Sequence, residues 1–320
     1  MATIHPTTST YNSGRLVITP NKLRIFLFGN RFRPGFIRQA LVYGLLIILT
    51  ILFILPFYWM LNTALKPIQQ VFTVPPSWYP DPPMFSNFVD TVKNSYGGSA
   101  TSVGGMPPIL KYALNTTLIT VNGVIATVFS SSLVAYAFAR LRFPGKNILF
   151  LGILSTLMIP FAVIMVPQFI LWKNLNWLDT FWPLMIPQWF GSAWNIFLLR
   201  QFFMGIPMDY DESALMDGAS HWDIFWKIIL PLSTPALATV GVFAFVFFWN
   251  DFLGPLIILS TPDHFTLTIY LTNFMIPLQK LTQWNLYMAA AFIVILPCMI
   301  LFFFSQNVFL KGITISEFRR

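Results

Sequence analysis

The feature that most constrains the fold is a 22-residue segment, 40–61, that is almost entirely apolar. At about 1.5 Å of rise per residue, a helix of this length reaches about 33 Å, enough to cross the hydrocarbon core of a bilayer. Composition agrees, because 56% of the 320 residues are hydrophobic and only 9% are charged. That leaves too little polar surface for a water-soluble globular protein of this size. The segment follows a long polar stretch and lacks a small-x-small cleavage pattern, so we expect it to remain as an anchor in an all-α integral membrane protein.

Further apolar segments are long enough to be spans, at 110–139, 148–171, 181–199, 235–260 and 286–306. The weakest is 181–199, which contains two prolines. If all six segments span and the amino terminus is inside, 14 of the 19 Lys and Arg residues are cytoplasmic and 5 are external. Without 181–199 the split would be 10 to 9. The positive-inside rule therefore favours six transmembrane helices with both termini in the cytoplasm.

This arrangement predicts five regions in chain order. They are a cytoplasmic tail (1–39), the first span (40–61), an extracytoplasmic loop (62–109), a five-helix core (110–306) with cytoplasmic helices at 207–231, and a cytoplasmic tail (307–320). The loop has a Pro-rich stretch and then a Gly/Ser-rich piece at 95–105, which is typical of ordered turns and a flexible tip. Three tryptophans lie at the outer ends of the third and fourth spans. We interpret Trp172, Trp177 and Trp182 as a membrane-interface belt in preference to a sugar-stacking surface.

Several kinds of chemistry are missing from the sequence. No phosphate loop occurs, because the single Gly-Lys pair, at Gly145, continues into Asn147. The 3 histidines and 1 cysteine show no metal-binding spacing. Asp251 is the one clear carboxylate in a predicted span, which is thin support for a proton- or ion-coupled carrier. We therefore expect no catalytic activity, no bound metal and no cofactor, and we expect any driving energy to come from a separate protein.

The net charge of +8 does not indicate nucleic-acid binding. Six of the 19 Lys and Arg residues fall in the first 38 positions, directly before the first apolar segment. There they act as a topology signal and not as a groove-binding patch.

The densest charge lies between the fourth and fifth predicted spans, where five acidic residues face one lysine between positions 203 and 231. An anionic leaflet would repel such a loop, so a protein partner is the better explanation. Asp209 and Glu212 fit a capping box that begins a helix, and Gly218 is placed to end it in a left-handed turn. Ser220 and Asp223 fit a second box.

The predicted product is a protruding pair of short helices, suited to a groove on a partner. From these features alone, a connector that lies on or dips into the membrane is supported about equally well.

The same segment carries a family pattern. Glu212-Ser213-Ala214 is followed by three residues, Gly218, nine residues and then Ile228-Ile229-Leu230-Pro231. This resembles the Glu-Ala-Ala-x3-Gly-x9-Ile-x-Leu-Pro pattern of binding-protein-dependent ABC import permeases, with Ser213 as the one departure. The resemblance extends from about Phe53 to the carboxyl terminus. Matches to the carbohydrate branch, specifically its maltose-type second permease subunit, are Ala135-Tyr136-Ala137-Phe138-Ala139-Arg140-Leu141, Trp249-Asn250-Asp251-Phe252 and Gly312-Ile313-Thr314.

The resemblance implies a type I ABC importer permease fold in a prokaryotic plasma (inner) membrane. It also implies a second homologous permease, two ABC ATPase subunits that use ATP, and an extracytoplasmic sugar-binding protein. The implied ATPase dock consists of Glu212, Ser213, Ala214, Asp217, Gly218, Ile228, Leu230 and Pro231. The carboxyl-terminal residues 316–320 depart from the small-residue ending common in the branch, so their contact with the ATPase stays open.

Polar residues within the predicted spans need partners, because hydrocarbon offers none. Asn115 and Asn122 lie seven residues apart on one helix face, where hydrogen bonding between helices is favoured over lining of a substrate pathway. Trp249, Asn250 and Asp251 are candidates either for contacts with the hydroxyls and faces of a sugar or for hydrogen bonding between helices. An importer for another solute, a membrane scaffold and a membrane enzyme with an unrecognised site remain alternatives.

Overall fold

The computed structural model describes residues 29–30, 33–93, 105–273 and 283–314. The predicted amino-terminal tail and the Gly/Ser-rich piece at 95–105 lie largely outside this part, and residues 316–320 lie wholly outside it. The chain divides into two units, Met1–Trp59 and Met60–Arg320, and each is described by itself.

The first unit contains a short hairpin and most of one long helix. Strands β1 (Gly29–Asn30) and β2 (Arg33–Pro34) pair antiparallel, and α2 (Phe36–Ala64) follows. α2 is longer than the predicted span at both ends, and Pro56 lies inside it without ending it. Apart from the hairpin, the described residues of the whole chain form helices and connecting segments, as an all-α prediction requires.

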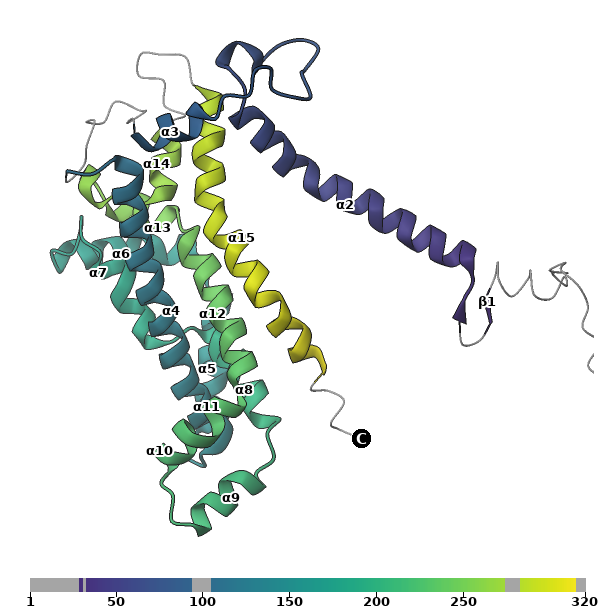
Figure 1. Cartoon of the computed structure of the whole chain (residues 1–320). Coiled ribbons are helices and arrows are strands. Elements are labelled where there is room, and N and C mark those ends of the chain that lie inside the picture. The colour runs from purple at the N-terminus through teal and green to yellow at the C-terminus, as the bar shows by residue number, and fades with distance from the viewer. Residues whose placement is uncertain (1–28, 31–32, 94–104, 274–282, 315–320) are drawn as a thin grey trace, which may run out of the picture. The chain divides into compact units, whose positions relative to one another are not determined.

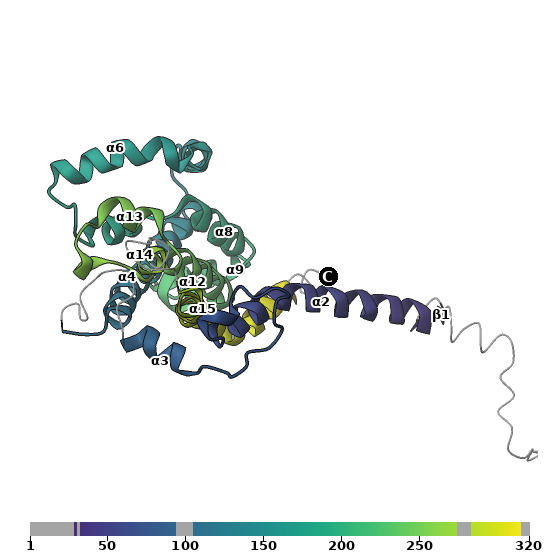
Figure 2. The ribbon, with the colours of Figure 1, turned by 90° about the horizontal axis from the view of Figure 1, so that it is seen from above.

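The second unit is built around α4 (Pro108–Arg140), which packs against α8 (Ala193–Met204) and α12 (Thr234–Trp249), while α12 packs against α15 (Trp284–Thr314). Figure 1 shows this unit as a bundle with α9 and α10 at one end and α3 and α14 at the other. In Figure 2, α6 lies at its periphery. The remaining elements are η1 (Ile68–Gln70), α3 (Ser86–Lys93), α5 (Lys146–Ser155), η2 (Thr156–Met158), α6 (Phe161–Asn174), α7 (Trp182–Met185), η3 (Ile186–Phe190), α9 (Asp209–Met216), α10 (His221–Ile224), η4 (Phe225–Ile229), α11 (Leu230–Leu232), α13 (Leu253–Ile258), η5 (Pro262–His264) and α14 (Leu267–Asn273).

The predicted spans are less continuous than expected. Among the described residues, α2, α4 and α15 are each long and apolar enough to cross a membrane, and two bent helix pairs bring the number to as many as five. The predicted span 148–171 bends by 97° between η2 and α6. Pro160 stands at this bend, and its ring disfavours helical geometry in the preceding residue, which is extended here.

Two other predicted spans are also interrupted. The segment 181–199 is divided among α7, η3 and α8, because Pro183 and Pro187 begin new helical turns and Gly191 adopts a positive φ of 85°. The segment 235–260 is divided after Trp249, where α12 ends and α13 begins a few residues later. The structure therefore confirms an all-helical bundle but not a count of six spanning helices.

Side chains of α4 supply hydrogen bonds where the neighbouring helices break. The Ser130 hydroxyl donates to the Gln188 carbonyl at 3.2 Å, and the Ser131 hydroxyl accepts from the Ser192 amide at 3.2 Å. The Thr116 hydroxyl likewise accepts from the amide of Leu267, at the start of α14, at 2.9 Å. Backbone groups freed by a helix break need a partner, so these polar residues allow the bundle to contain broken helices.

The loop predicted to be external, 62–109, is ordered by polar contacts where the structure describes it. The Lys66 ammonium donates to the Ser77 carbonyl at 2.6 Å, and the Asn87 amide donates to the Ala64 and Lys66 carbonyls at 2.8 and 3.0 Å. These contacts hold the Pro-rich stretch and α3 against the end of α2 within the second unit.

The close approach of α4 and α12 yields a stability prediction. A methyl group at Gly123 would stand 2.5 to 2.8 Å from three ring atoms of Phe248, which is itself buried. We expect Gly123→Ala to destabilise the protein by about 1–3 kcal/mol through overpacking, despite the higher helix propensity of alanine. Gly152→Ala, in α5, is the matched control because nothing lies within 4 Å of the added methyl. Thermal unfolding in detergent should show a lower Tm for the first variant only; equal Tm values would contradict the tight contact.

Candidate functional site

The segment from α9 to α11 forms the predicted pair of short helices. α9 is followed by Gly218, whose φ of 83° turns the chain into α10 and then into the single π-helical turn η4. A β-carbon added at Gly218 would meet nothing within 4 Å. Glycine is therefore favoured here by its backbone conformation and not by lack of space. We call residues 207–231 the knob.

The two predicted capping boxes have different outcomes. The box at Asp209 and Glu212 is wrong, because α9 has Met208 as its N-cap and no side-chain cap. Asp209 is already helical, so the acids of the first turn favour the helix through its dipole instead.

The second box is confirmed. The Ser220 hydroxyl accepts from the Asp223 amide, and the Asp223 carboxylate accepts from the Ser220 amide, both at 3.2 Å. Hydrogen bonds from Lys227 and then Ser220 lower the pKa of Asp223 to about 2. The carboxylate that begins α10 is therefore ionised at neutral pH.

The knob contains an open hollow of about 470 Å³ between α9 and η4. Its lining includes four residues of the implied ATPase dock and the acidic Asp209; the full set is Pro207, Asp209, Tyr210, Ser213, Ala214, Asp217 and Ile228. Of the other dock residues, Glu212, Gly218 and Pro231 are exposed, whereas Leu230 is half-buried. The hollow is thus bordered by residues from the first part of the family pattern, in α9, and by Ile228 from its last part.

The inner face of the knob is attached to α4. Arg140 donates to the Ile206 carbonyl at 2.9 Å and to the Met208 sulfur at 2.8 Å, and its guanidinium lies 3.6 Å from the Asp211 carboxylate. Burial raises the pKa of Asp211, and the charge of Arg140 opposes that shift. The Tyr136 hydroxyl, one helical turn earlier, donates to the His221 carbonyl at 3.1 Å.

Asp211 was not among the residues singled out from the sequence. It is only 5% exposed, although it adjoins the exposed Glu212. The available signal was its spacing of three from Ala214, which packs on the apolar cluster beneath the knob. This spacing places Asp211 on the inner face of α9.

The three adjacent residues considered for a substrate pathway have different surroundings. Trp249 is buried, donates to the Val294 carbonyl at 2.9 Å and stacks on Phe245 at 5.4 Å. Asn250 is exposed and donates to the carbonyl one turn before it at 2.8 Å. The Asp251 carboxylate accepts from the Gly254 amide at 3.2 Å. Trp249 thus has a packing role, and Asn250 is the member of the three that is open to a ligand.

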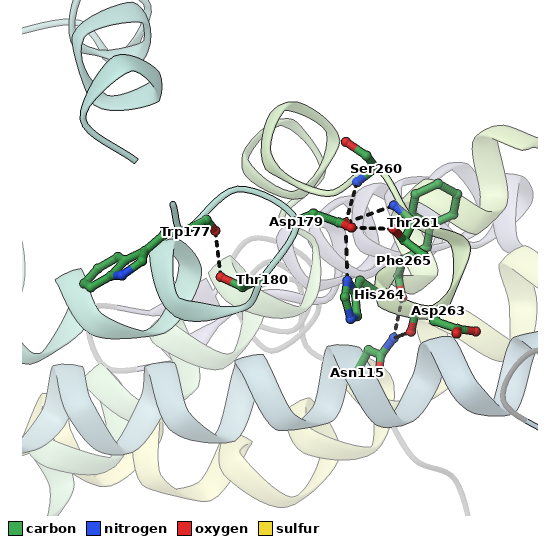
Figure 3. Close-up of polar contacts among 9 residues, drawn as sticks. All are labelled: Asn115, Trp177, Asp179, Thr180, Ser260, Thr261, Asp263, His264 and Phe265. Atoms are coloured by element: carbon green, nitrogen blue, oxygen red, sulfur yellow. Dashed lines mark hydrogen bonds and ion pairs between the residues drawn. The ribbon is translucent and has the colours of Figure 1, made fainter. Parts of the chain in front are cut away.

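Asn115 and Asn122 also differ. Asn115 is buried, and its amide donates to the Asp263 and Phe265 carbonyls at 2.8 and 3.0 Å, which joins α4 to the segment between α13 and α14 (Figure 3). Asn122 is half-buried, and its side-chain oxygen has no hydrogen-bond partner among the described residues. The contacts of Asn115 fit the interpretation that it joins helices by hydrogen bonds. Asn122 has an unpaired acceptor inside the bundle.

A second polar cluster, centred on Asp179, was missed at the sequence level. Its carboxylate accepts from the amides of Ser260 and Thr261 at 2.8 and 2.9 Å and from the Thr261 hydroxyl, and it lies 3.3 Å from the His264 ring (Figure 3). Burial would raise the pKa of Asp179, but the hydrogen bonds outweigh burial and hold this pKa below its usual range. Asp179 has a φ of 59°, a conformation that Asp and Asn adopt more readily than most residues.

The tryptophans near this cluster pack on each other. Trp172 and Trp177 stack with their ring centroids 5.5 Å apart, and Trp182 is 55% exposed at the start of α7. The membrane-interface belt stays a prediction for these three residues.

Comparison with known proteins identifies the family to which the sequence is similar. Residues 128–315 match the family described as binding-protein-dependent transport system inner membrane component. The sn-glycerol-3-phosphate transport system permease protein UgpE of Yersinia pestis is 33% identical over 85% of this chain and 95% of its own length. The arabinooligosaccharides transport system permease protein AraQ of Bacillus subtilis is 30% identical over 84% and 91%.

Solved structures agree on the fold. A chain of a bacterial ABC transporter involved in the import of the acidic polysaccharide alginate superposes with a TM-score of 0.72 at 23% identity, covering 86% of this chain and 99% of that one. A chain of a bacterial alginate ABC transporter in complex with an alginate pentasaccharide-bound periplasmic protein superposes with a TM-score of 0.58. The family expected from the pattern in the knob is confirmed, and the chain belongs to the binding-protein-dependent transport system inner membrane components.

Proposed function

We propose that this chain translocates a sugar or oligosaccharide as one permease subunit of an ABC importer. The observation that carries the proposal is the knob, which exposes Glu212, Asp217 and Gly218 at one end of the bundle and contains the hollow that Asp217 helps to line. An acidic, protruding helix pair fits a groove on a soluble protein better than an anionic membrane surface. The chain itself binds no cofactor and performs no catalysis; its energy comes from ATP used by two ATPase subunits.

The proposed assembly contains a second, homologous permease and an extracytoplasmic binding protein that delivers the substrate. The chain lies in a prokaryotic plasma membrane with six spans and both termini in the cytoplasm, so that the knob faces the ATPase and residues 62–109 face outward. The distribution of Lys and Arg supports this topology. Closure of the ATPase pair would draw the two permeases' docking segments together and switch the side to which the central pathway opens.

Two relatives bear on the substrate. One is named for arabinooligosaccharides and the other for sn-glycerol-3-phosphate, and a chain of similar fold belongs to an alginate importer. Each of these solutes carries hydroxyl groups, anionic oxygen groups, or both. A sugar or oligosaccharide is therefore our first candidate, and a phosphorylated polyol is the second. Uptake of labelled oligosaccharides and of glycerol-3-phosphate by proteoliposomes with the cognate binding protein would decide between them, and uptake of neither would contradict both.

The bend at Gly218 yields a prediction about coupling. Gly218→Val should abolish most substrate uptake, because a β-branched residue is strained at a φ of 83° and the bend must open. Gly218→Asn is the matched control, since asparagine tolerates this conformation and nothing lies within 4 Å of the new side chain's first carbon. Uptake by proteoliposomes should fall at least tenfold for Val and remain near the normal rate for Asn. Equal uptake by both variants would show that the bend is not required.

A second prediction concerns the charge of the dock. Glu212→Lys should reduce the yield of co-purified ATPase subunits at least tenfold. The reason is that reversing the charge of this exposed side chain removes its charge complementarity with the partner's surface. Asp81→Lys makes the same charge reversal at an exposed position of the external loop and should leave the yield of ATPase unchanged. Affinity isolation from detergent provides the measurement. Full recovery of ATPase with Glu212→Lys would contradict a role of Glu212 in docking, whereas absence of ATPase from the unmodified chain would favour a membrane scaffold.

A further inference from the structure

Helix α4 is attached by polar contacts near both of its ends. It is 33 residues long, and its only proline is at its first position. Between Asn115 and Arg140 the helix advances about 38 Å at about 1.5 Å per residue, which is most of a bilayer. Helices α8 and α12 pack against α4. A displacement at one end of such a braced helix is carried to the other end.

At one end, α4 contacts the knob at two places, before α9 and at the start of α10. Arg140 bonds to residues that lead into α9, and Tyr136 bonds to the first residue of α10. The side chains of Arg140 and Asp211 are 2% and 7% exposed. Separating them would leave a buried charge without its partner, so the knob and the end of α4 are held together.

At the opposite end, α4 binds the backbone between α13 and α14. Both amide hydrogens of Asn115 are used by the Asp263 and Phe265 carbonyls, and Thr116 accepts from the Leu267 amide. The other side of this segment is bonded to Asp179, as Figure 3 shows. The segment 260–267 is therefore fixed between α4 and the loop that precedes α7.

We propose that α4 transmits movement of the docked knob to the segment 260–267, and that Tyr136, Arg140, Asn115 and Thr116 are the positioning residues of this connection. The proposal rests on the proposed function, because it requires an ATPase that moves the knob. Its basis is the continuous chain of contacts from His221 through α4 to Leu267. In this arrangement Asn115 transmits force and does not bind the transported solute.

The test uses the complete importer, assembled from both permeases, the ATPase subunits and the binding protein. Cys298 is replaced by Ala, and the exposed Ser260 is replaced by Cys as a reporter. The rate at which a thiol reagent modifies the reporter is compared with and without ATP and vanadate. We expect the nucleotide to change this rate at least fivefold in the otherwise unmodified chain.

Three variants interrupt the connection at its two ends. Tyr136→Phe removes one hydroxyl at the knob, Asn115→Leu removes the amide at the far end, and Thr116→Val removes only a hydroxyl if the Asn115 variant fails to fold. Each should reduce the nucleotide response of the reporter at least threefold while ATPase subunits still co-purify normally. The double variant Tyr136→Phe with Asn115→Leu should lose no more response than the more severe single variant, because contacts in series fail together.

Additive losses, or an undiminished response in Asn115→Leu and Thr116→Val, would overturn the proposal. Failure of the proposed function would look different, because no ATPase would co-purify even with the unmodified chain.

Discussion

The structure depends on the requirement that backbone groups inside the bundle find hydrogen-bond partners within the protein. Hydrocarbon supplies none, and the helices around α4 break at Pro187, Gly191 and the residues after Trp249. Small polar side chains of α4 meet two of the interruptions: Ser130 and Ser131 bond to the connection between η3 and α8, and Thr116 bonds to the start of α14. The central helix α4 is therefore less apolar than α2, and its polar residues serve packing and connection between helices.

The knob combines two kinds of surface on one short segment. Its outer face exposes Glu212 and Ser213, whereas its inner face buries Asp211 against Arg140. A docking element that transmits movement needs both properties, since it must bind a partner and remain fixed to the membrane domain. The alternation between exposed and buried acids on α9 follows from the helical period, which turns adjacent side chains by about 100°.

Much of the candidate site could be predicted from residues alone. Charge and capping signals in the knob predicted the two helices and the left-handed turn at Gly218, and Ser220 with Asp223 predicted the second cap. The family was predicted by the resemblance of the segment from Glu212 to Pro231 to a known pattern. The first cap was wrong because a capping box specifies which residues can pair and not which residue ends the preceding turn. Asp179 escaped notice because its partners, Ser260 to His264, lie more than 80 residues away in sequence.

The sequence by itself determined that the chain is helical and that its solvent is a bilayer, and it predicted that the driving energy comes from a separate protein. Apolar segment length, charge distribution and the missing phosphate loop are local or compositional properties, so they can be read without coordinates. Only the tertiary structure decided where the predicted spans break, that Trp249 packs inside the bundle and that Asn115 binds the backbone near Phe265. These outcomes depend on which distant segment supplies each hydrogen bond, and hydrophobic periodicity carries no information about that choice.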